Sequence, residues 1–180
     1  MSTLLEDVFK VVITGETWVG KTCLVHRYVN ARFISDTKKT IGVDFALKSV
    51  VAQHPETGEQ EITLQLWDFA GEERFKQVLP LYVSGTQGIV FCFEATRPET
   101  LENMPTWLDI FHRSGIKPVI LLCATKCDLV EEKNINENLV KKMIEKYSVH
   151  QYIETSALTG ENVEKLFSSI TDAMLEASEG

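Results

Sequence analysis

The chain has 180 residues, of which 44% are hydrophobic and 24% charged, with 18 Lys and Arg residues against 26 Asp and Glu residues. This composition is that of a globular protein and excludes a disordered or fibrous chain. The net charge of −8, without a dense basic patch in the sequence, argues against a nucleic-acid partner, because phosphate backbones are bound by clustered Lys and Arg.

The first apolar run, Phe9–Thr14, leads directly into residues 15–22, GETWVGKT, and then into a helical stretch, Lys21–Asn30. The eight residues have the spacing G-x-x-x-x-G-K-[ST] of a phosphate-binding loop. Its two glycines let backbone N–H groups turn towards phosphate oxygens, and the helix adds its positive end. Lys21 supplies a mobile cation, and the Thr22 hydroxyl is a ligand for Mg²⁺. The segment predicts binding of a nucleoside triphosphate; the alternative is an ordinary glycine turn with a surface lysine.

Two segments of alternating polarity, Gly42–Val51 and Ile62–Trp67, predict strands. Residues 54–58, HPETG, lie between them and are typical of a turn, so we expect an antiparallel hairpin at one edge of the sheet. The longest apolar runs, Gly88–Phe93 and Val119–Ala124, have the length of buried strands and not of membrane spans. These patterns favour an α/β sheet and no transmembrane segment.

Two later segments carry apolar residues on one helical face, from Leu101 to Phe111 and from Val163 to Met174. Pro105 should lie in the first turn of its helix, with Asn103 as a candidate cap, because inside a helix a proline removes a hydrogen bond. Since strands and helices alternate, we expect one doubly wound α/β domain over residues 1–180. Ligands of such sheets bind at the carboxyl ends of the strands.

The cysteines show no C-x-x-C spacing, and each lies in or beside an apolar segment. We therefore expect reduced thiols and a cytoplasmic protein. Residues 176–180, EASEG, contain no cysteine motif for prenylation, so membrane association is expected only through partners or through C-terminal residues beyond this sequence. The cysteines are Cys23, Cys92, Cys123 and Cys127.

Three short motifs follow strands further along the chain. In the first, a D-x-x-G, Asp68 can hold a water on Mg²⁺, and the N–H of Gly71 can reach a γ-phosphate that a side chain would block. The other two are residues 124–128, ATKCD, and residues 154–157, ETSA. Because both follow strands of one sheet, their loops can enclose a base. The spacing of all the motifs together is a stronger signal than any one of them.

With these motifs the chain resembles the Ras superfamily of small GTPases over essentially its whole length. Residues 40–45, TIGVDF, match the effector region of the Rab branch, and residues 70–75, AGEERF, match its A-G-Q-E-R-F at all but one position. Phe45, Trp67 and Tyr82 fall where Rab proteins keep an aromatic triad; ordinary core or edge aromatics are an equal alternative. The resemblance implies a three-layer P-loop GTPase fold, with a mostly parallel six-stranded sheet, one antiparallel edge strand and helices on both faces.

The resemblance also implies a switch that binds GTP or GDP with Mg²⁺ and hydrolyses GTP. Asp128 would accept hydrogen bonds from guanine that adenine cannot donate, Lys126 would lie along the base, and Phe33 would pack edge-on against it. The alternative for Asp128 is a cap of the following segment. The residues implied to bind the nucleotide are Thr17, Trp18, Val19, Gly20, Lys21, Thr22, Cys23, Phe33, Thr40, Gly71, Thr125, Lys126, Asp128, Ser156, Ala157 and Leu158. Those implied to hold Mg²⁺ are Thr22, Thr40 and, through a water, Asp68, and those implied in catalysis are Glu72, Lys21 and Gly71.

Five positions depart from the family pattern. Glu72 stands where most relatives carry the Gln that orients the attacking water, and its charge would face an anionic γ-phosphate, so we expect slow hydrolysis. A carboxylate acting as a general base would have the opposite effect. Thr17 and Trp18 replace small residues of the phosphate loop; the Trp18 ring could shield the phosphates, contact a partner or crowd an arginine finger. Thr125 replaces the Asn of N-K-x-D, and Thr37 stands where a Tyr commonly covers the γ-phosphate.

We expect a monomer whose partners are proteins, namely effectors, an exchange factor and a GTPase-activating protein. They would contact about residues 34–45 and 70–82, two loops expected to relax when the γ-phosphate leaves. A GTP-binding scaffold with negligible hydrolysis is the alternative function. A small-molecule P-loop kinase shares the first motif but needs a second substrate pocket and an Arg-rich lid, which the sequence does not indicate.

Overall fold

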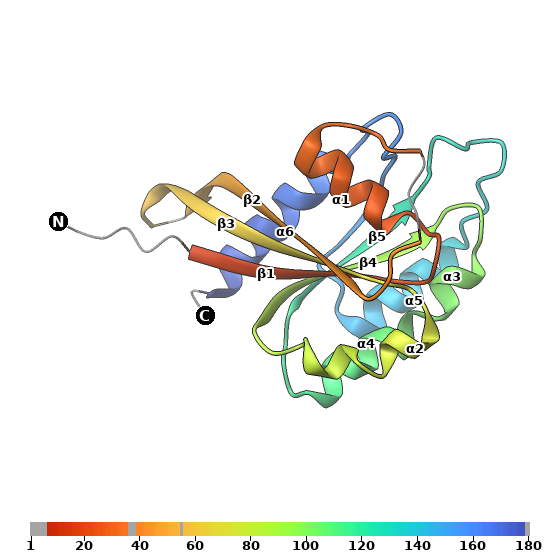
Figure 1. Ribbon diagram of the computed structural model, residues 1–180, viewed down its shortest axis with the longest axis horizontal. Coiled ribbons are helices and arrows are strands. Elements are labelled where there is room, and N and C mark those ends of the chain that lie inside the picture. The colour runs from red at the N-terminus through yellow and green to blue at the C-terminus, as the bar shows by residue number, and fades with distance from the viewer. Residues whose placement is uncertain (1–6, 36–38, 55, 179–180) are drawn as a thin grey trace.

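The computed structural model describes residues 7–35, 39–54 and 56–178. Its centre is a six-stranded sheet with the order β2-β3-β1-β4-β5-β6 (Figure 1). All neighbouring strands are parallel except β2 and β3, which confirms the predicted sheet and its reversed edge strand. The strands are β1 (Asp7–Thr14), β2 (Val43–His54), β3 (Gly58–Phe69), β4 (Thr86–Glu94), β5 (Val119–Thr125) and β6 (Gln151–Glu154).

The burial of each strand follows its place in the sheet. Nearly every residue of the central strands β4 and β5 is buried, as expected for parallel strands that are covered on both faces. The edge strand β2 alternates between exposed and partly buried residues. Its hairpin with β3 pairs His54 with Gly58 beside the predicted turn. β3 begins before the predicted strand because backbone pairing continues through the polar residues 59–61, which carry no apolar alternation.

Helices cover both faces of the sheet and produce three layers (Figure 1). On one face, α1 (Lys21–Asn30) and α6 (Val163–Ser178) share a core with side chains of β1, β3 and β4. On the other face, α4 (Met104–Arg113) and α5 (Glu137–Tyr147) pack over the same strands. The remaining helices are short: α2 (Glu73–Lys76), the 3-10 helix η1 (Leu79–Leu81) and α3 (Glu99–Glu102). Ile170 in the middle of the predicted stripe of α6 is fully buried.

The segment predicted as one helix from Leu101 to Phe111 is two helices, α3 and α4, which are separated at Asn103. Pro105 lies in the first turn of α4, as predicted, because it has no N–H with which to continue α3. The Asn103 side chain makes no capping hydrogen bond; its carbonyl accepts from the backbone N and the hydroxyl of Thr106, at 3.1 and 2.7 Å. The apolar face continues across the break, since its residues Leu101, Met104, Leu108 and Phe111 are all buried.

The four cysteines all lie in the described part of the chain, and none is in a disulfide. Cys92 and Cys123 are buried in the sheet, whereas Cys23 and Cys127 are partly exposed.

Among residues 7–35, 39–54 and 56–178, no helix has both the length and the hydrophobicity that crossing a lipid bilayer requires.

Candidate functional site: a pocket at the strand ends

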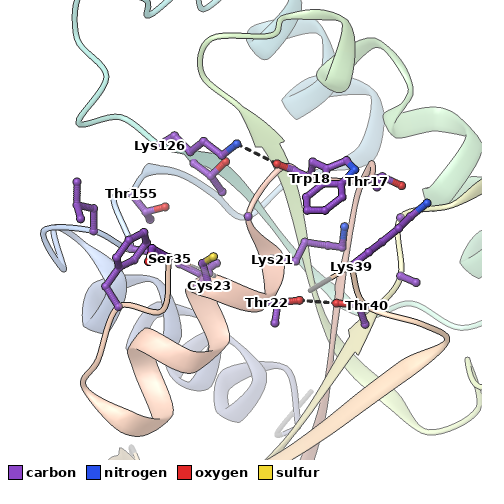
Figure 2. A pocket seen from close by; sticks show the side chains of 18 of the residues that line it. Thr17, Trp18, Lys21, Thr22, Cys23, Ser35, Lys39, Thr40, Lys126 and Thr155 are labelled. Carbon is purple, nitrogen blue, oxygen red and sulfur yellow. Dashed lines mark hydrogen bonds between the residues drawn. The ribbon is translucent and has the colours of Figure 1, made fainter. Parts of the chain in front are cut away.

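A cavity of about 440 Å³ lies where β1, β3, β5 and β6 end at their carboxyl termini (Figure 2). This volume is in the range of small-molecule sites. All the residues predicted to bind the nucleotide line it, except Val19 and Ser156, and so do the three predicted catalytic residues. Six further residues that the sequence did not single out also line it: Leu24, Ser35, Lys39, Ala70, Leu129 and Thr155.

The phosphate loop turns from β1 into α1 and holds an ammonium group beneath the cavity. Gly15 and Gly20, at its two ends, have φ values of 138° and 102°. Lys21 is only 5% exposed, and its Nζ donates to the carbonyls of Gly15 and Glu16, at 2.9 and 2.7 Å. Burial lowers the pKa of Lys21, and the nearby carboxylate of Asp68 opposes that shift. A buried cation that faces a cavity is suited to a polyphosphate.

Glu16 connects the phosphate loop to two helices, α2 and α4. The indole nitrogen of Trp107, a fully buried residue of α4, donates to Glu16 Oε1 at 3.0 Å. Lys76 of α2 lies 3.8 Å from the same oxygen and 4.7 Å from the centroid of the Trp107 ring. These contacts join the loop, α2 and α4. Nothing in the local sequence indicated them, because the partners are 60 and 91 positions away along the chain.

Three oxygen-bearing side chains meet beside the phosphate loop. The Thr22 hydroxyl is 2.7 Å from the Thr40 hydroxyl (Figure 2). It also donates to Asp68 Oδ2, at 2.5 Å. Asp68 is 2% exposed, and its other oxygen, Oδ1, is buried without a hydrogen-bond partner among the described residues. Burial is also the main cause that raises the pKa of Asp68 to about 6. Hydroxyl and carboxylate oxygens are what Mg²⁺ prefers, so this set fits that cation.

The described residues contain no group of three or more His, Cys, Asp or Glu side chains that could enclose a metal ion by themselves. Magnesium characteristically binds through one or two protein oxygens together with phosphate oxygens and water. The donor set of Thr22, Thr40 and Asp68 therefore suits a cation that arrives with a phosphate ligand.

Gly71 lies against the phosphate loop. A Cβ on this residue would be 2.2 Å from the backbone N of Thr17 and 2.2 Å from the backbone C of Glu16. The sequence indicated a glycine here because a side chain would block a γ-phosphate. The structure adds a second reason, which is that the backbones of the two loops approach too closely for any side chain.

The predicted base loop is held to the phosphate loop by two of its residues. The Thr125 hydroxyl donates to the carbonyl of Val19 at 2.5 Å. The side chain of Val19 is buried in the core that α1 and α6 form with the sheet, and it does not line the cavity. Lys126 Nζ donates to the carbonyl of Trp18 at 2.9 Å (Figure 2). It also pairs with Glu94 Oε2, at 2.9 Å. Thr125 therefore makes a structural contact of its own, at the position where the family motif implies Asn.

Ser156 positions the carboxylate of Asp128. Its hydroxyl donates to Asp128 Oδ1 at 2.6 Å and accepts from the backbone N of Thr159 at 3.1 Å. Ser156 is fully buried, whereas Asp128 is partly exposed and lines the cavity. The loops after β5 and β6 thus converge as predicted, with Ser156 behind the cavity wall and Asp128 in it.

Glu72 forms ion pairs through both of its carboxylate oxygens. Oε1 lies 3.0 Å from Lys39 Nζ, and Oε2 lies 2.9 Å from Arg74 Nε. The hydrogen bond from Lys39 is the largest cause that holds the pKa of Glu72 below its usual value. The sequence-based prediction considered the repulsion between this carboxylate and the γ-phosphate, and its action as a general base, but not its pairing with a lysine. The sequence carried one sign of this pairing, because Lys39, directly before Thr40, has the opposite charge to Glu72.

Trp18 has a backbone conformation that is rare for a residue with a side chain. Its φ is 66°, and the side chain is 58% exposed, so the ring is not part of the core. Figure 2 shows Trp18 among the residues around the cavity, near Lys21. An exposed ring beside the cavity is compatible with all three expectations, namely shielding of a ligand, contact with a partner and crowding of an arginine finger. Thr37, the other unusual position facing the predicted γ-phosphate, lies outside the described residues.

The three aromatic residues of the predicted triad form one surface cluster. The ring centroids of Phe45 and Trp67 are 5.1 Å apart, and those of Trp67 and Tyr82 are 6.0 Å apart. Phe45 is 46% exposed and Tyr82 37% exposed. The cluster joins the hairpin edge of the sheet to the segment that follows η1. Exposure to this extent is not that of core aromatics, and it leaves an apolar face for a partner.

The parallel sheet, the glycine-bounded loop after β1 and the convergent loops after β5 and β6 define a P-loop nucleotide-binding protein. The chain belongs to the Ras family, whose family model matches residues 10–176. It is 34% identical to the Ras-related protein Rab11A of Lotus japonicus over 167 residues, which cover 92% of this chain and 71% of that protein. It is 35% identical to human Ras-related protein Rab-30 over 161 residues, which cover 89% of this chain and 76% of that protein. It is 31% identical to bovine Ras-related protein Rab-13 over 181 aligned positions, which cover 100% of this chain and 86% of that protein.

Proposed function

We propose that this protein is a guanine-nucleotide switch that binds GTP and GDP with Mg²⁺ and hydrolyses GTP slowly. Membership of the Ras family supports the binding of guanine nucleotides. The observation that carries the proposal is that Lys21 and Asp128 line the same cavity. An ammonium for phosphates and a carboxylate for a base edge are what a guanosine triphosphate requires.

The residues of the pocket divide between the two ends of the nucleotide. Lys21 would donate to β- and γ-phosphate oxygens beside the positive end of α1. Asp128, held by Ser156, would accept from N1–H and the exocyclic amine of guanine. Adenine lacks these donors, so its binding would leave a carboxylate unpaired. The aliphatic part of Lys126 and the ring of Phe33, which is 38% exposed, would cover the base.

Mg²⁺ would be held by the hydroxyls of Thr22 and Thr40, with Asp68 acting through a water. When bound, the cation would neutralise charge on the phosphates. The hydroxyl of Thr40 comes from the segment before β2, and it already lies 2.7 Å from that of Thr22. Loss of the γ-phosphate would remove one of the interactions that would hold the Thr40 segment beside Thr22. A switch of the order-to-disorder kind follows from that arrangement.

Slow hydrolysis follows from the chemistry of Glu72. The cationic neighbours that hold its pKa low keep it ionised at neutral pH. An ionised carboxylate accepts hydrogen bonds but donates none, so it cannot contact an attacking water and a phosphate oxygen together as a neutral amide can. Its charge also opposes that of the γ-phosphate.

Glu72→Gln is expected to hydrolyse GTP at least about tenfold faster than the natural protein, because the amide restores a donor and removes the repulsion. The measurement is a single-turnover assay on GTP-loaded protein, with GDP quantified by chromatography. Glu73→Gln makes the same chemical change at the next residue, whose side chain is 84% exposed, and it should alter the rate less than about twofold. A Glu72→Gln protein no faster than the natural one would contradict slow hydrolysis through Glu72.

The same assay separates a slow enzyme from a scaffold that binds GTP and does not turn it over. A scaffold is the better description if the natural protein and Glu72→Gln both leave GTP intact over many hours. The protein partners expected of either would contact residues of about 34–45 and 70–82. The aromatic cluster of Phe45, Trp67 and Tyr82, partly exposed beside both segments, supports that surface.

A further inference from the structure

Lys39 and Glu72 form an ion pair between two separate segments at the mouth of the cavity. Lys39 precedes β2 and Glu72 follows β3, and their charged atoms are 3.0 Å apart. Both residues line the cavity, in which Lys21 and Gly71 also lie. Figure 2 shows the extended side chain of Lys39 together with those of Lys21 and Thr40.

The backbone brings the two segments together next to this ion pair. The N–H of Ala70 donates to the carbonyl of Gly42 at 2.9 Å, and Val43 pairs with Phe69 where β2 and β3 meet the two segments. The Lys39 pair therefore adds a side-chain contact to the backbone contacts between the two segments. The other cation on Glu72 differs, because Arg74 belongs to the same segment as Glu72 and its side chain is 66% exposed.

We propose that Lys39 is a positioning residue for hydrolysis, which holds the Glu72 carboxylate at the cavity and offsets its charge there. The inference rests on the proposed function, since it concerns the approach of Glu72 to a γ-phosphate. Without Lys39, the carboxylate would face the anionic phosphate with one cation fewer, and repulsion would move the segment around Gly71 outwards. Lys39 therefore limits the loss of rate that Glu72 causes.

A double-mutant cycle isolates this effect. The proteins are the natural chain, Lys39→Ala, Glu72→Gln and the double variant, each loaded with GTP and followed through a single turnover. Lys39→Ala should slow hydrolysis about threefold to fivefold when Glu72 is present. In the Glu72→Gln background the same change should alter the rate less than about 1.5-fold, because no carboxylate is left to position. Lys39→Arg should restore the natural rate within about twofold, since it keeps the charge.

Two control variants exclude a general effect of charge or of folding. Lys117→Ala removes one positive charge from an exposed residue just before β5, at the opposite end of the sheet, and should leave the rate unchanged. Arg74→Ala removes the other cation from Glu72 without unlinking the two segments, and should slow hydrolysis less than Lys39→Ala does. Thermal melting of every variant checks that each is folded.

The dissociation constant for a fluorescent GTP analogue distinguishes the ways in which the proposals can fail. Equal slowing by Lys39→Ala in both backgrounds would show that Lys39 acts on the nucleotide itself, and would overturn the inference alone. Absence of slowing, with GTP bound and hydrolysed normally, would do the same. If none of the folded proteins binds GTP, the proposed function fails together with the inference.

Discussion

Gly15→Ala is expected to lower the free energy of unfolding by about 3–5 kcal/mol, the sum of a strained backbone and an overpacked contact. The φ of Gly15 is 138°, a conformation that residues with a side chain rarely adopt. A Cβ there would lie 2.1 Å from the carbonyl oxygen of Cys92. Cys92 lies in the central strand β4 and pairs with Cys123 of β5, and its neighbour Phe91 pairs with Thr14 of β1, so the backbone there is held in the sheet. The alanine side chain therefore could not be accommodated without a change in the backbone of the phosphate loop.

Urea unfolding, followed by far-UV circular dichroism, measures this loss. Gly85→Ala is the matched control, because Gly85 has a φ of 74° and a Cβ there would meet nothing within 4 Å. It should cost about 1 kcal/mol, from the backbone alone. A Gly15→Ala protein that is already unfolded in buffer, beside a folded Gly85→Ala protein, also fits the expectation. Equal costs for the two substitutions would contradict the close contact between the phosphate loop and β4.

Lys21→Met is expected to weaken GTP binding by about 2–5 kcal/mol, which is about 30-fold to several thousandfold in the dissociation constant. Methionine fills the narrow space of the buried lysine stem but has no charge. The phosphates would then lose their contact with the Lys21 ammonium. The backbone N–H groups of the phosphate loop would remain. Lys21 is buried against Gly15 and Glu16, so water cannot readily replace its ammonium.

Binding of a fluorescent GTP analogue gives the two dissociation constants, and thermal melting shows whether the variant is folded. Lys117→Ala, which removes an exposed lysine away from the cavity, should bind as the natural protein does. If Lys21→Met is folded and binds GTP with unchanged affinity, Lys21 is not a phosphate ligand.

Local patterns and spacing predicted five strands and the reversed edge, whereas the sixth strand was implied by the resemblance and no pattern had located α5. Apolar runs located β4 and β5, alternation located β2 and β3, and the turn at residues 54–58 reversed the edge strand. The break between α3 and α4 was not predicted, although Pro105 was placed correctly. The apolar stripe runs through both helices, and a stripe does not reveal that the backbone between them has left the helical path.

The motifs also predicted most of the cavity wall, because each lies directly after a strand whose end reaches the same edge of the sheet. What they could not predict were contacts between distant segments. Gly71 against Glu16 and Thr17, Ser156 behind Asp128, and Lys39 beside Glu72 all depend on how loops meet in space. Opposite charges at Lys39 and Glu72 are visible in the sequence, but their pairing is not.

The proposed selection of guanine by Asp128, in a pocket where Lys21 would bind phosphate, is tested most directly by titration calorimetry. Nucleotide-free protein is titrated with GTP and, separately, with ATP, both in the presence of Mg²⁺. We predict that GTP binds at least about a hundredfold more tightly than ATP, because adenine leaves a carboxylate without its donors. Equal affinities for the two nucleotides, or no binding of either, would contradict the assignment of this pocket to guanine nucleotides.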